Sequence, residues 1–270
     1  MPVFDHDEIQ IFYRDRGTGQ PFIFQHGLGA DSSQPFELFK PGPGIRQIGF
    51  DARAHGQTRP AGDPRHFGFA TFAADLRALM DHLGIERAVV GGISMGAGIA
   101  LRFTLSHPER VQALVLSRPA WLDAPSPWNA RMFTLITTLL REHGPALGKE
   151  RFMASRDYTE TLAQWPDVAA SLAGQFDSPQ VAETAEKYQR IITDCPNRDP
   201  REWETLGVPT LILANRRDPI HPFEIAQTLA AAIPGATLRE LTPKAVNVPQ
   251  HNADTHHAIT KFLEGHFPIR

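Results

Sequence analysis

The chain has 270 residues, 41% hydrophobic and 21% charged, a composition that excludes disorder and suits one large α/β domain or two small ones. Its 27 basic and 30 acidic residues give a formal net charge of −3 without a Lys/Arg cluster, which argues against nucleic acid or an anionic membrane as partner. The single cysteine, Cys195, excludes an internal disulfide framework, and an acidic start without a signal-peptide pattern predicts a soluble, cytoplasmic protein.

Short apolar runs that end at turn residues predict strands in both terminal parts of the chain. Residues 9–13 alternate polar and apolar types, which predicts a half-exposed antiparallel strand. Nearly continuous apolar runs are typical of strands that are buried on both faces, as in a parallel sheet between two layers of helices. Such runs occupy residues 22–25, 47–50, 88–92, 111–116, 210–214 and 236–241.

Apolar residues at spacings of three and four predict amphipathic helices between these strands. Phe72, Leu76, Leu79 and Leu83 form one such stripe, and Gly84 is expected to end that helix. Further helices are predicted over residues 95–105, around residues 225–233 and over residues 259–263. We interpret these stripes as core packing, not as parts of a cofactor site.

The middle of the chain, residues 119–204, differs from both ends. It contains helical patterns, many prolines and four tryptophan-centred patches, and it has no convincing strand. We therefore predict an α/β core formed by residues 1–118 and 205–270, with residues 119–204 inserted as a helical cap or lid. Such an insertion would lie over the carboxyl ends of the strands, where open α/β sheets bind their ligands.

The sequence Gly-Ile-Ser-Met-Gly at residues 92–96 follows a predicted strand and opens a predicted helix. A strand that turns abruptly into a helix forces the central serine into a strained conformation, so the residues two positions away must lack side chains. The same turn places the Ser94 hydroxyl beside the partly positive N-terminal end of the helix. Ser94 is therefore the predicted nucleophile.

Further segments extend this observation into a resemblance to a known family. Residues 25–29 (Gln-His-Gly-Leu-Gly), 51–58 and 107–111 are similar to segments of the α/β-hydrolase fold superfamily, although Ala54 replaces a usual glycine. The chain resembles the serine hydrolase branch, which includes esterases, lactonases and haloperoxidases. The resemblance implies a mostly parallel sheet flanked by helices on both faces, with a helical cap inserted before the last strands.

The resemblance also implies an oxyanion hole formed by backbone N–H groups. By similarity these belong to Leu28, in the turn after the predicted strand at residues 22–25, and to Met95, directly after the nucleophile. Such donors stabilise a tetrahedral intermediate by roughly 3 kcal/mol apiece. His26 is expected to brace its turn, and residues 51–58 are expected to be structural.

A serine nucleophile needs a base that a carboxylate orients, and the family order is serine, acid, histidine. Asp218 matches the position of the acid. The family histidine lies just beyond the last strand, but residues 245–247, where it is expected, contain none. His251 is the nearest histidine and is the favoured base, with His221 as a second candidate. An absent base stays open as an alternative.

We therefore expect a serine hydrolase that cleaves an ester, lactone or similar acyl bond of a small, apolar substrate through Ser94, His251 and Asp218. No metal or organic cofactor is implied, because metal-ligand spacings and a phosphate-binding loop are missing. Three alternatives stay open: a non-catalytic small-molecule-binding module, an acyltransferase and a carbon–carbon bond hydrolase. Dehalogenases and epoxide hydrolases of the family use an aspartate where Ser94 stands. The sequence leaves the oligomeric state open, a homo-oligomer included.

Overall fold

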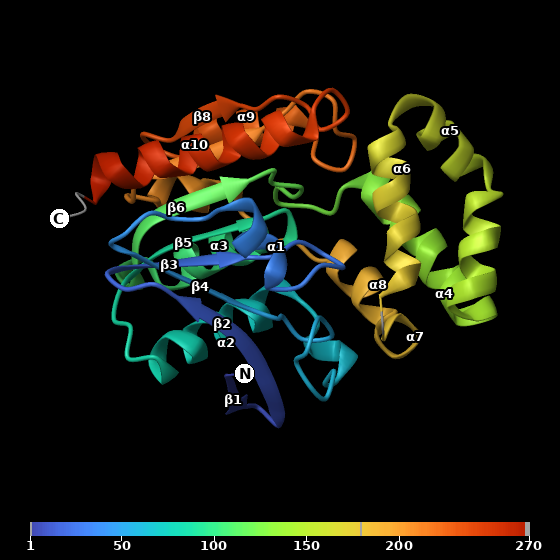
Figure 1. The fold of residues 1–270 in the computed structure, drawn as a ribbon, viewed down its shortest axis with the longest axis horizontal. Helices are drawn as coiled ribbons and strands as arrows, with labels where there is room; N and C mark the ends of the chain where they lie inside the picture. Colours follow the sequence, from blue (N-terminus) through green and yellow to red (C-terminus); the bar gives the residue numbers. More distant parts are fainter. Residues whose placement is uncertain (1, 179, 268–270) are drawn as a thin grey trace.

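A computed structural model describes residues 2–178 and 180–267 and contains one eight-stranded sheet (Figure 1). The strands are β1 Val3–His6, β2 Ile9–Arg16, β3 Gln20–Gln25, β4 Ile45–Phe50, β5 Ala88–Ile93, β6 Val111–Ser117, β7 Thr210–Ala214 and β8 Thr237–Glu240. Their order is β1-β2-β4-β3-β5-β6-β7-β8. Only β1 and β2 pair in antiparallel fashion with their neighbours, and all other pairs are parallel. The predicted, mostly parallel sheet is confirmed.

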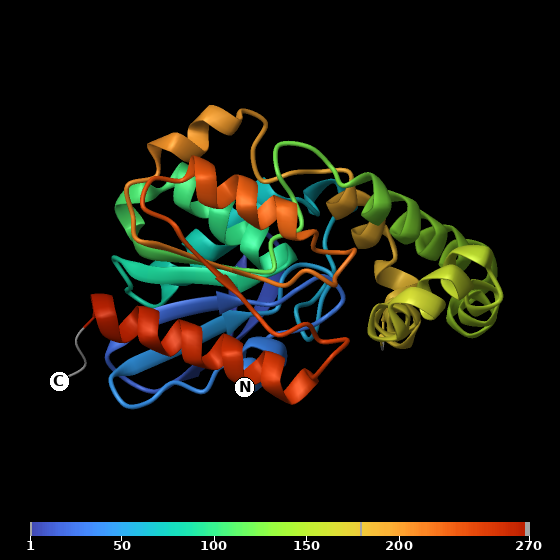
Figure 2. The same ribbon diagram turned by 90° about the horizontal axis from the view of Figure 1, so that it is seen from above.

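Helices cover both faces of this sheet, and the alternation of side chains along each strand explains why. In β3, Phe22 and Phe24 point into a cluster shared with α1 (Ser33–Leu38) and α10 (Val248–His266), whereas Ile23 joins the opposite cluster. That opposite cluster is shared with α2 (Phe69–His82), α3 (Met95–Ser106) and α9 (Phe223–Ala232). Figure 2 shows α10 on one side of the sheet and α3 and α9 on the other. Strands buried on both faces require this three-layer arrangement.

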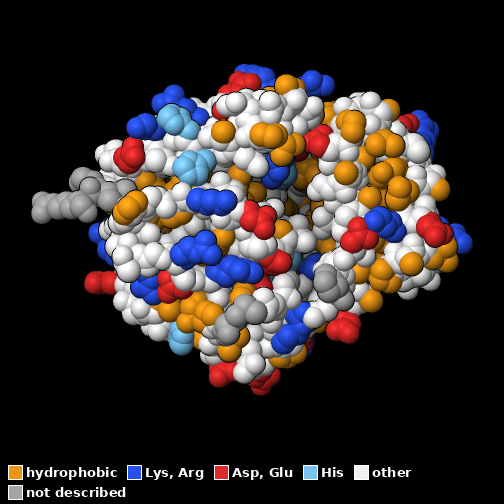
Figure 3. Space-filling view, viewed as in Figure 1, with side chains coloured by type: hydrophobic (Ala, Val, Ile, Leu, Met, Phe, Trp, Pro, Cys, Tyr) orange, Lys and Arg blue, Asp and Glu red, His pale blue; other side chains and the backbone are white. Residues whose placement is uncertain are grey.

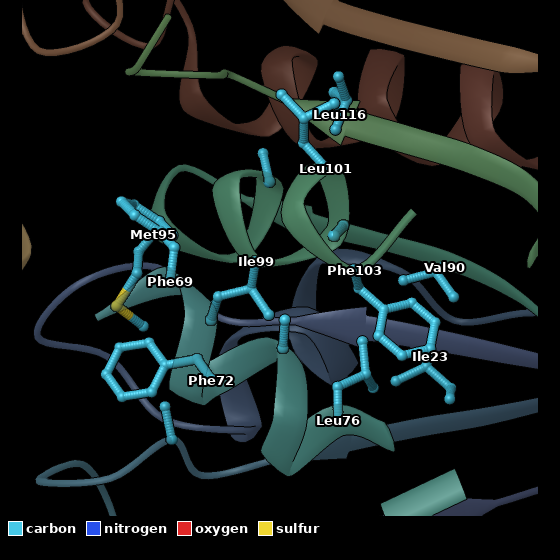
Figure 4. Close-up of a cluster of buried hydrophobic side chains, with 14 of the residues drawn as sticks. Ile23, Phe69, Phe72, Leu76, Val90, Met95, Ile99, Leu101, Phe103 and Leu116 are labelled. Carbon is cyan, nitrogen blue, oxygen red and sulfur yellow. The ribbon is translucent and has the colours of Figure 1, made fainter. Parts of the chain in front are cut away.

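The larger of the two apolar clusters that flank the sheet contains residues of α2 and α3. Figure 4 shows Ile99 of α3 pointing toward Phe72 and Leu76 of α2, with Ile23 and Val90 of the sheet beside them. All five side chains are almost fully buried. This packing fixes the N-terminal end of α3 relative to the carboxyl end of β5.

The last helix begins earlier than the sequence predicts. The sequence suggested a helix over residues 259–263, but α10 already begins at Val248. The Asn247 side chain caps its N-terminus by accepting a hydrogen bond from the Gln250 N–H at 3.0 Å, and Pro249 fits the first turn because that turn has no use for its missing N–H. His251 therefore lies inside the helix and not in the loop before it.

The inserted segment forms a helical group with its own apolar core. Its helices are α4 (Pro127–Met153, kinked at Gly144), α5 (Arg156–Gln164), α6 (Pro166–Ala173), α7 (Val181–Thr184) and α8 (Glu186–Ile192). Figure 1 shows the α4–α8 group together, beyond the end of the sheet toward which β6 points. The buried side chains of its hydrophobic cluster all come from residues 132–192. The group is therefore packed internally and meets the sheet part at one side.

Lys187 of α8 ties this group to the sheet part. Its side chain is buried, and its Nζ donates to the Ala54 carbonyl at 2.9 Å and to Thr184 Oγ1 at 3.2 Å. Ala54 has a φ of 62°, a left-handed conformation that glycine adopts more easily, which explains why glycine is usual there. Burial, together with the nearby Arg59, lowers the pKa of Lys187 to about 7.

This lowered pKa predicts a pH-dependent contribution to stability. The unfolded chain binds the Lys187 proton up to about pH 10.5 and the folded chain only to about pH 7, so this group makes folding more favourable as the pH rises between these values. Relative to Lys187→Met, the wild-type free energy of unfolding should increase by about 2 kcal/mol from pH 7 to pH 9. Urea denaturation at both pH values measures this difference. An equal difference at the two values would contradict the lowered pKa, and the exposed Lys261→Met provides the control.

Within the described part of the chain, no helix combines the length and apolarity required to cross a bilayer.

Candidate active site

The site lies where four neighbouring parallel strands end. Ser94 follows β5, Arg118 follows β6, Asp218 lies four residues beyond β7, and Lys244 lies four residues beyond β8. Parallel strands end at the same edge of a sheet, so these four side chains converge there. All four line one pocket, of about 260 Å³.

The pocket is enclosed from two sides. The sheet part provides its floor, and Phe133 of α4 with Asp167, Val168 and Leu172 of α6 provides the opposite wall. Figure 3 shows the surface hollowed between the sheet part and the α4–α8 group. Pockets of this kind, bounded by apolar side chains and a few polar groups, are typical of small-molecule sites.

Ser94 occupies a strained turn between β5 and α3. Its φ of 55° and ψ of −111° lie outside the regions that side-chain-bearing residues favour. A Cβ on Gly92 would lie 2.1 Å from the carbonyl carbon of Gly96, and a Cβ on Gly96 would lie 2.4 Å from the Gln25 carbonyl oxygen. Only glycine fits at either position, so the spacing of the motif follows from the turn that carries Ser94.

The turn after β3 lies directly against this serine. A Cβ on Gly27 would approach the Ser94 Cβ to 3.6 Å. The backbone N–H groups of Leu28 and Met95 donate no hydrogen bond to any described residue. Both amides are thus available to a ligand beside Ser94. His26 braces the turn: its Nδ1 bonds the Gly27 carbonyl at 2.8 Å, and its Nε2 accepts from the Ala52 N–H at 3.0 Å.

The histidine that is hydrogen-bonded to Asp218 is His221. The Nδ1–H of His221 donates to Asp218 Oδ2 at 2.8 Å, and both side chains are buried. The same carboxylate also accepts a hydrogen bond from Arg118 Nη1 at 3.3 Å. Burial alone would raise the pKa of the Asp218 carboxyl, but its contacts with His221 and Arg118 hold that pKa well below the usual range. Burial, opposed by Asp218, lowers the pKa of the His221 imidazole.

An ionised carboxylate beside a neutral imidazole orients that imidazole. With Nδ1 donating to Asp218, Nε2 of His221 is an acceptor, and this buried atom has no hydrogen-bond partner among the described residues. His221 and Ser94 line the same pocket. The Ser94 hydroxyl makes no hydrogen bond to a described residue, so neither this hydroxyl nor Nε2 of His221 is occupied by another group.

The structure does not pair His251 with Asp218 as the sequence suggested. The Nδ1 of His251 bonds the Thr242 carbonyl at 2.8 Å, because the early start of α10 directs this ring toward the end of β8. His251 is buried and does not line the pocket that contains Ser94. Burial and the nearby Arg118 lower its pKa to about 4. Its assignment as the base stays a prediction.

One sequence signal could have given His221 more weight. In Asp-Pro-Ile-His at residues 218–221, the carboxylate and the imidazole are three residues apart. The N–H groups of Ile220 and His221 donate to Asp218 Oδ1 at 3.1 and 3.3 Å, which closes a tight turn. Such a turn brings the His221 ring back to the Asp218 carboxylate.

Within the described ranges, no group of three or more His, Cys, Asp or Glu could hold a metal ion.

Comparison with known proteins adds a family to this geometry. Residues 20–245 match the family model of the alpha/beta hydrolase fold. The AB hydrolase superfamily protein YisY of Bacillus subtilis is 30% identical over 251 residues, which cover 84% of this chain and 85% of YisY.

Two solved structures share the fold. The enol-lactonase of Burkholderia xenovorans LB400 matches with a TM-score of 0.73 at 21% identity, over 97% of this chain and 99% of the enol-lactonase. A thermophilic esterase from Thermogutta terrifontis matches with a TM-score of 0.70 at 24% identity, over 95% of this chain and 94% of the esterase. At these identities the likeness concerns the fold alone.

Proposed function

Because the chain belongs to the α/β-hydrolase fold family, we propose that it is a serine hydrolase that cleaves an ester, lactone or similar acyl bond of a small molecule. Its structural neighbours include an enol-lactonase and an esterase, its curated relatives include putative carbamate hydrolases, and the chain is an enzyme of the hydrolase class. The observation that carries the proposal is a serine in a strained strand-to-helix turn that shares one pocket with a buried Asp–His pair.

The proposed reaction begins at Ser94. Its Oγ attacks the acyl carbonyl while Nε2 of His221 accepts the hydroxyl proton, and the Asp218 carboxylate stabilises the imidazolium that forms. The backbone N–H groups of Leu28 and Met95 then bind the oxyanion. The imidazolium returns its proton to the leaving oxygen, which leaves an acyl-enzyme on Ser94. Water, deprotonated by His221, releases the acid and restores the serine.

His221 is proposed as the base instead of His251 for two structural reasons. His221 lines the Ser94 pocket with an unpartnered Nε2, and its Nδ1 bonds the only carboxylate that lies beyond β7 in this pocket among the described residues. The Nδ1 of His251 is bonded to a backbone carbonyl, which cannot orient and stabilise an imidazolium as a carboxylate does.

Covalent labelling tests whether Ser94 is a nucleophile. A fluorophosphonate should add once to the wild-type protein, and the adduct should be absent in Ser94→Ala, because only an activated serine attacks phosphorus at a useful rate. Intact-protein mass spectrometry measures the added mass, and peptide mapping locates it. Ser171 lines the same pocket, so Ser171→Ala is a matched control that should keep the label. A wild-type protein that stays unmodified would favour a binding module over a hydrolase.

A further inference from the structure

Lys244 is a charged group in the pocket that the proposed reaction does not use. It lies beyond β8, at the edge of the segment where the family resemblance places a histidine, and its side chain is partly buried. Arg118 lines the same pocket from the end of β6. Two cations therefore stand on the side of the pocket that also contains Asp218.

These two cations differ in how they are paired. Arg118 contacts Asp218, with 3.3 Å between Nη1 and Oδ2. Lys244 Nζ makes no hydrogen bond and no ion pair within 4.0 Å to any residue that the structure describes. The neighbouring Arg118 guanidinium, together with burial, lowers the pKa of Lys244 to about 8, so the ammonium is still mostly charged at pH 7. An unpaired ammonium facing a pocket is stabilised by an anion placed beside it.

Other polar atoms in this pocket also lack partners. Nε1 of Trp121 and Oδ1 of Asn129 are buried without a hydrogen bond among the described residues, and both side chains are less than 5% exposed. Both residues line the pocket. Buried polar groups in folded proteins are normally satisfied, so unpaired ones in a pocket indicate a polar ligand. The indole N–H can only donate, and it therefore requires an acceptor such as a carboxylate or ester oxygen.

The rest of the pocket limits what can be attached to such an anion. Phe133, Val168, Leu172 and Ile220 give it an apolar wall, which suits a short carbon chain. Asp167 of α6 is a second acid in the lining, and its Oδ1 is buried without a hydrogen-bond partner among the described residues. Its charge acts on Lys244 without an ion pair between the two, and it disfavours a further negative charge near α6.

We propose that Lys244, assisted by Arg118, binds a carboxylate of the substrate, so that the enzyme prefers small esters or lactones that carry an acid group at the far end of a short acyl chain. The cleavage of an acyl bond in this inference rests on the proposed function, whereas the binding of a carboxylate rests on the charged and polar groups of the pocket. The reacting carbonyl would lie at Ser94 and the carboxylate at Lys244, with the carbon chain against the apolar wall.

Two p-nitrophenyl esters that differ only at the acyl terminus test this proposal. The half-ester of glutaric acid ends in a carboxylate, whereas the valerate ester ends in a methyl group. Wild-type kcat/KM should be at least about tenfold higher for the glutarate half-ester, a ratio that one charge-assisted hydrogen bond provides. In Lys244→Met this ratio should fall toward one, mainly through KM, and Lys244→Arg should restore part of it.

A lysine outside the pocket provides the control for this test. Lys261→Met, on the exposed side of α10, should keep the wild-type ratio. A wild-type preference for the valerate ester would overturn the proposal. So would equal losses of kcat on both esters in Lys244→Met, which would instead give Lys244 a role in proton transfer.

A binding measurement separates this proposal from the proposed function. Free glutarate should raise the melting temperature of Ser94→Ala, and glutaramide, the uncharged diamide, should not. The double variant Ser94→Ala/Lys244→Met should lose the response to glutarate. If glutarate binds in this way and no ester is cleaved, the anion site stands and the hydrolase proposal fails. If esters are cleaved and glutarate has no effect, the hydrolase proposal stands and the anion site fails.

Discussion

His221→Asn is expected to lower kcat/KM for ester cleavage by at least about 10³, because the variant leaves Ser94 without a proton acceptor while the oxyanion donors remain. Asparagine is close in size to histidine, and its amide can still donate to Asp218, so the buried pair is replaced without a large cavity. Steady-state cleavage of a p-nitrophenyl ester measures the loss. Circular dichroism and the melting temperature establish that the variant is folded.

His251→Asn is the matched control for this variant. Its amide can donate to the Thr242 carbonyl as the Nδ1–H of His251 does, so the local hydrogen bond is kept. Ester cleavage should stay close to that of the wild type. The opposite pattern, with activity lost in His251→Asn and kept in His221→Asn, would return the base to the position that the sequence suggested.

The pH profile gives a second readout of the same base. The base acts as a neutral imidazole, and burial holds the pKa of His221 below 6.5. We therefore expect kcat/KM to rise with pH through a pKa below 6.5 and to be level above that value. An acid limb at or above 6.5 would contradict a buried imidazole as the base.

Gly96→Ala is expected to have the second large effect, through the turn that carries Ser94. The new Cβ would lie 2.4 Å from the Gln25 carbonyl oxygen and 2.8 Å from that of His26, and both are backbone atoms of β3 and its turn. Neither carbonyl can yield without moving the turn that contains Leu28 away from Ser94. The free energy of unfolding should fall by about 3 kcal/mol, and labelling of Ser94 should be largely lost. Urea denaturation and the fluorophosphonate adduct measure the two effects.

Gly265→Ala separates this clash from the general effect of an alanine in a helix. Gly265 lies near the C-terminal end of α10, and a Cβ there meets nothing within 4 Å. Alanine should stabilise this helix by up to about 1 kcal/mol, since glycine is the weaker helix former. A Gly96→Ala variant with the stability of the wild type would show that the turn after β3 moves freely, against the contacts described above.

Much of the fold follows from the sequence because burial on both faces leaves a clear pattern. The strands from Ile9 to Glu240 were predicted within a few residues, since their apolar runs end at glycine, proline or polar turns. The short edge strand Val3–His6 was missed because it buries Phe4 alone, and one buried side chain sets no pattern. The elbow at Ser94 was readable because its glycines are required by backbone contacts and not by a partner far away.

The contacts of the two candidate histidines were harder to predict because they depend on tertiary structure. The sequence favoured His251 on the expectation of a loop before the last helix, but the Asn247 cap makes that stretch the first turn of α10. Conversely, His221 looked remote because only a folded turn shows that its ring reaches Asp218. The spacing of residues in the sequence predicts contacts within one helix or strand well. It does not predict which loop lines a pocket between several elements.

The separate apolar cluster of the α4–α8 group has a consequence for how this enzyme could change during evolution. Its buried side chains pack among themselves, and those that face the pocket, such as Phe133 and Val168, lie at the margin of that cluster. Replacement of such margin residues alters the shape offered to the acyl chain and leaves the packing around the sheet as it was. New substrate preferences can therefore arise on one side of the pocket while Ser94, Asp218 and His221 on the other side are inherited intact.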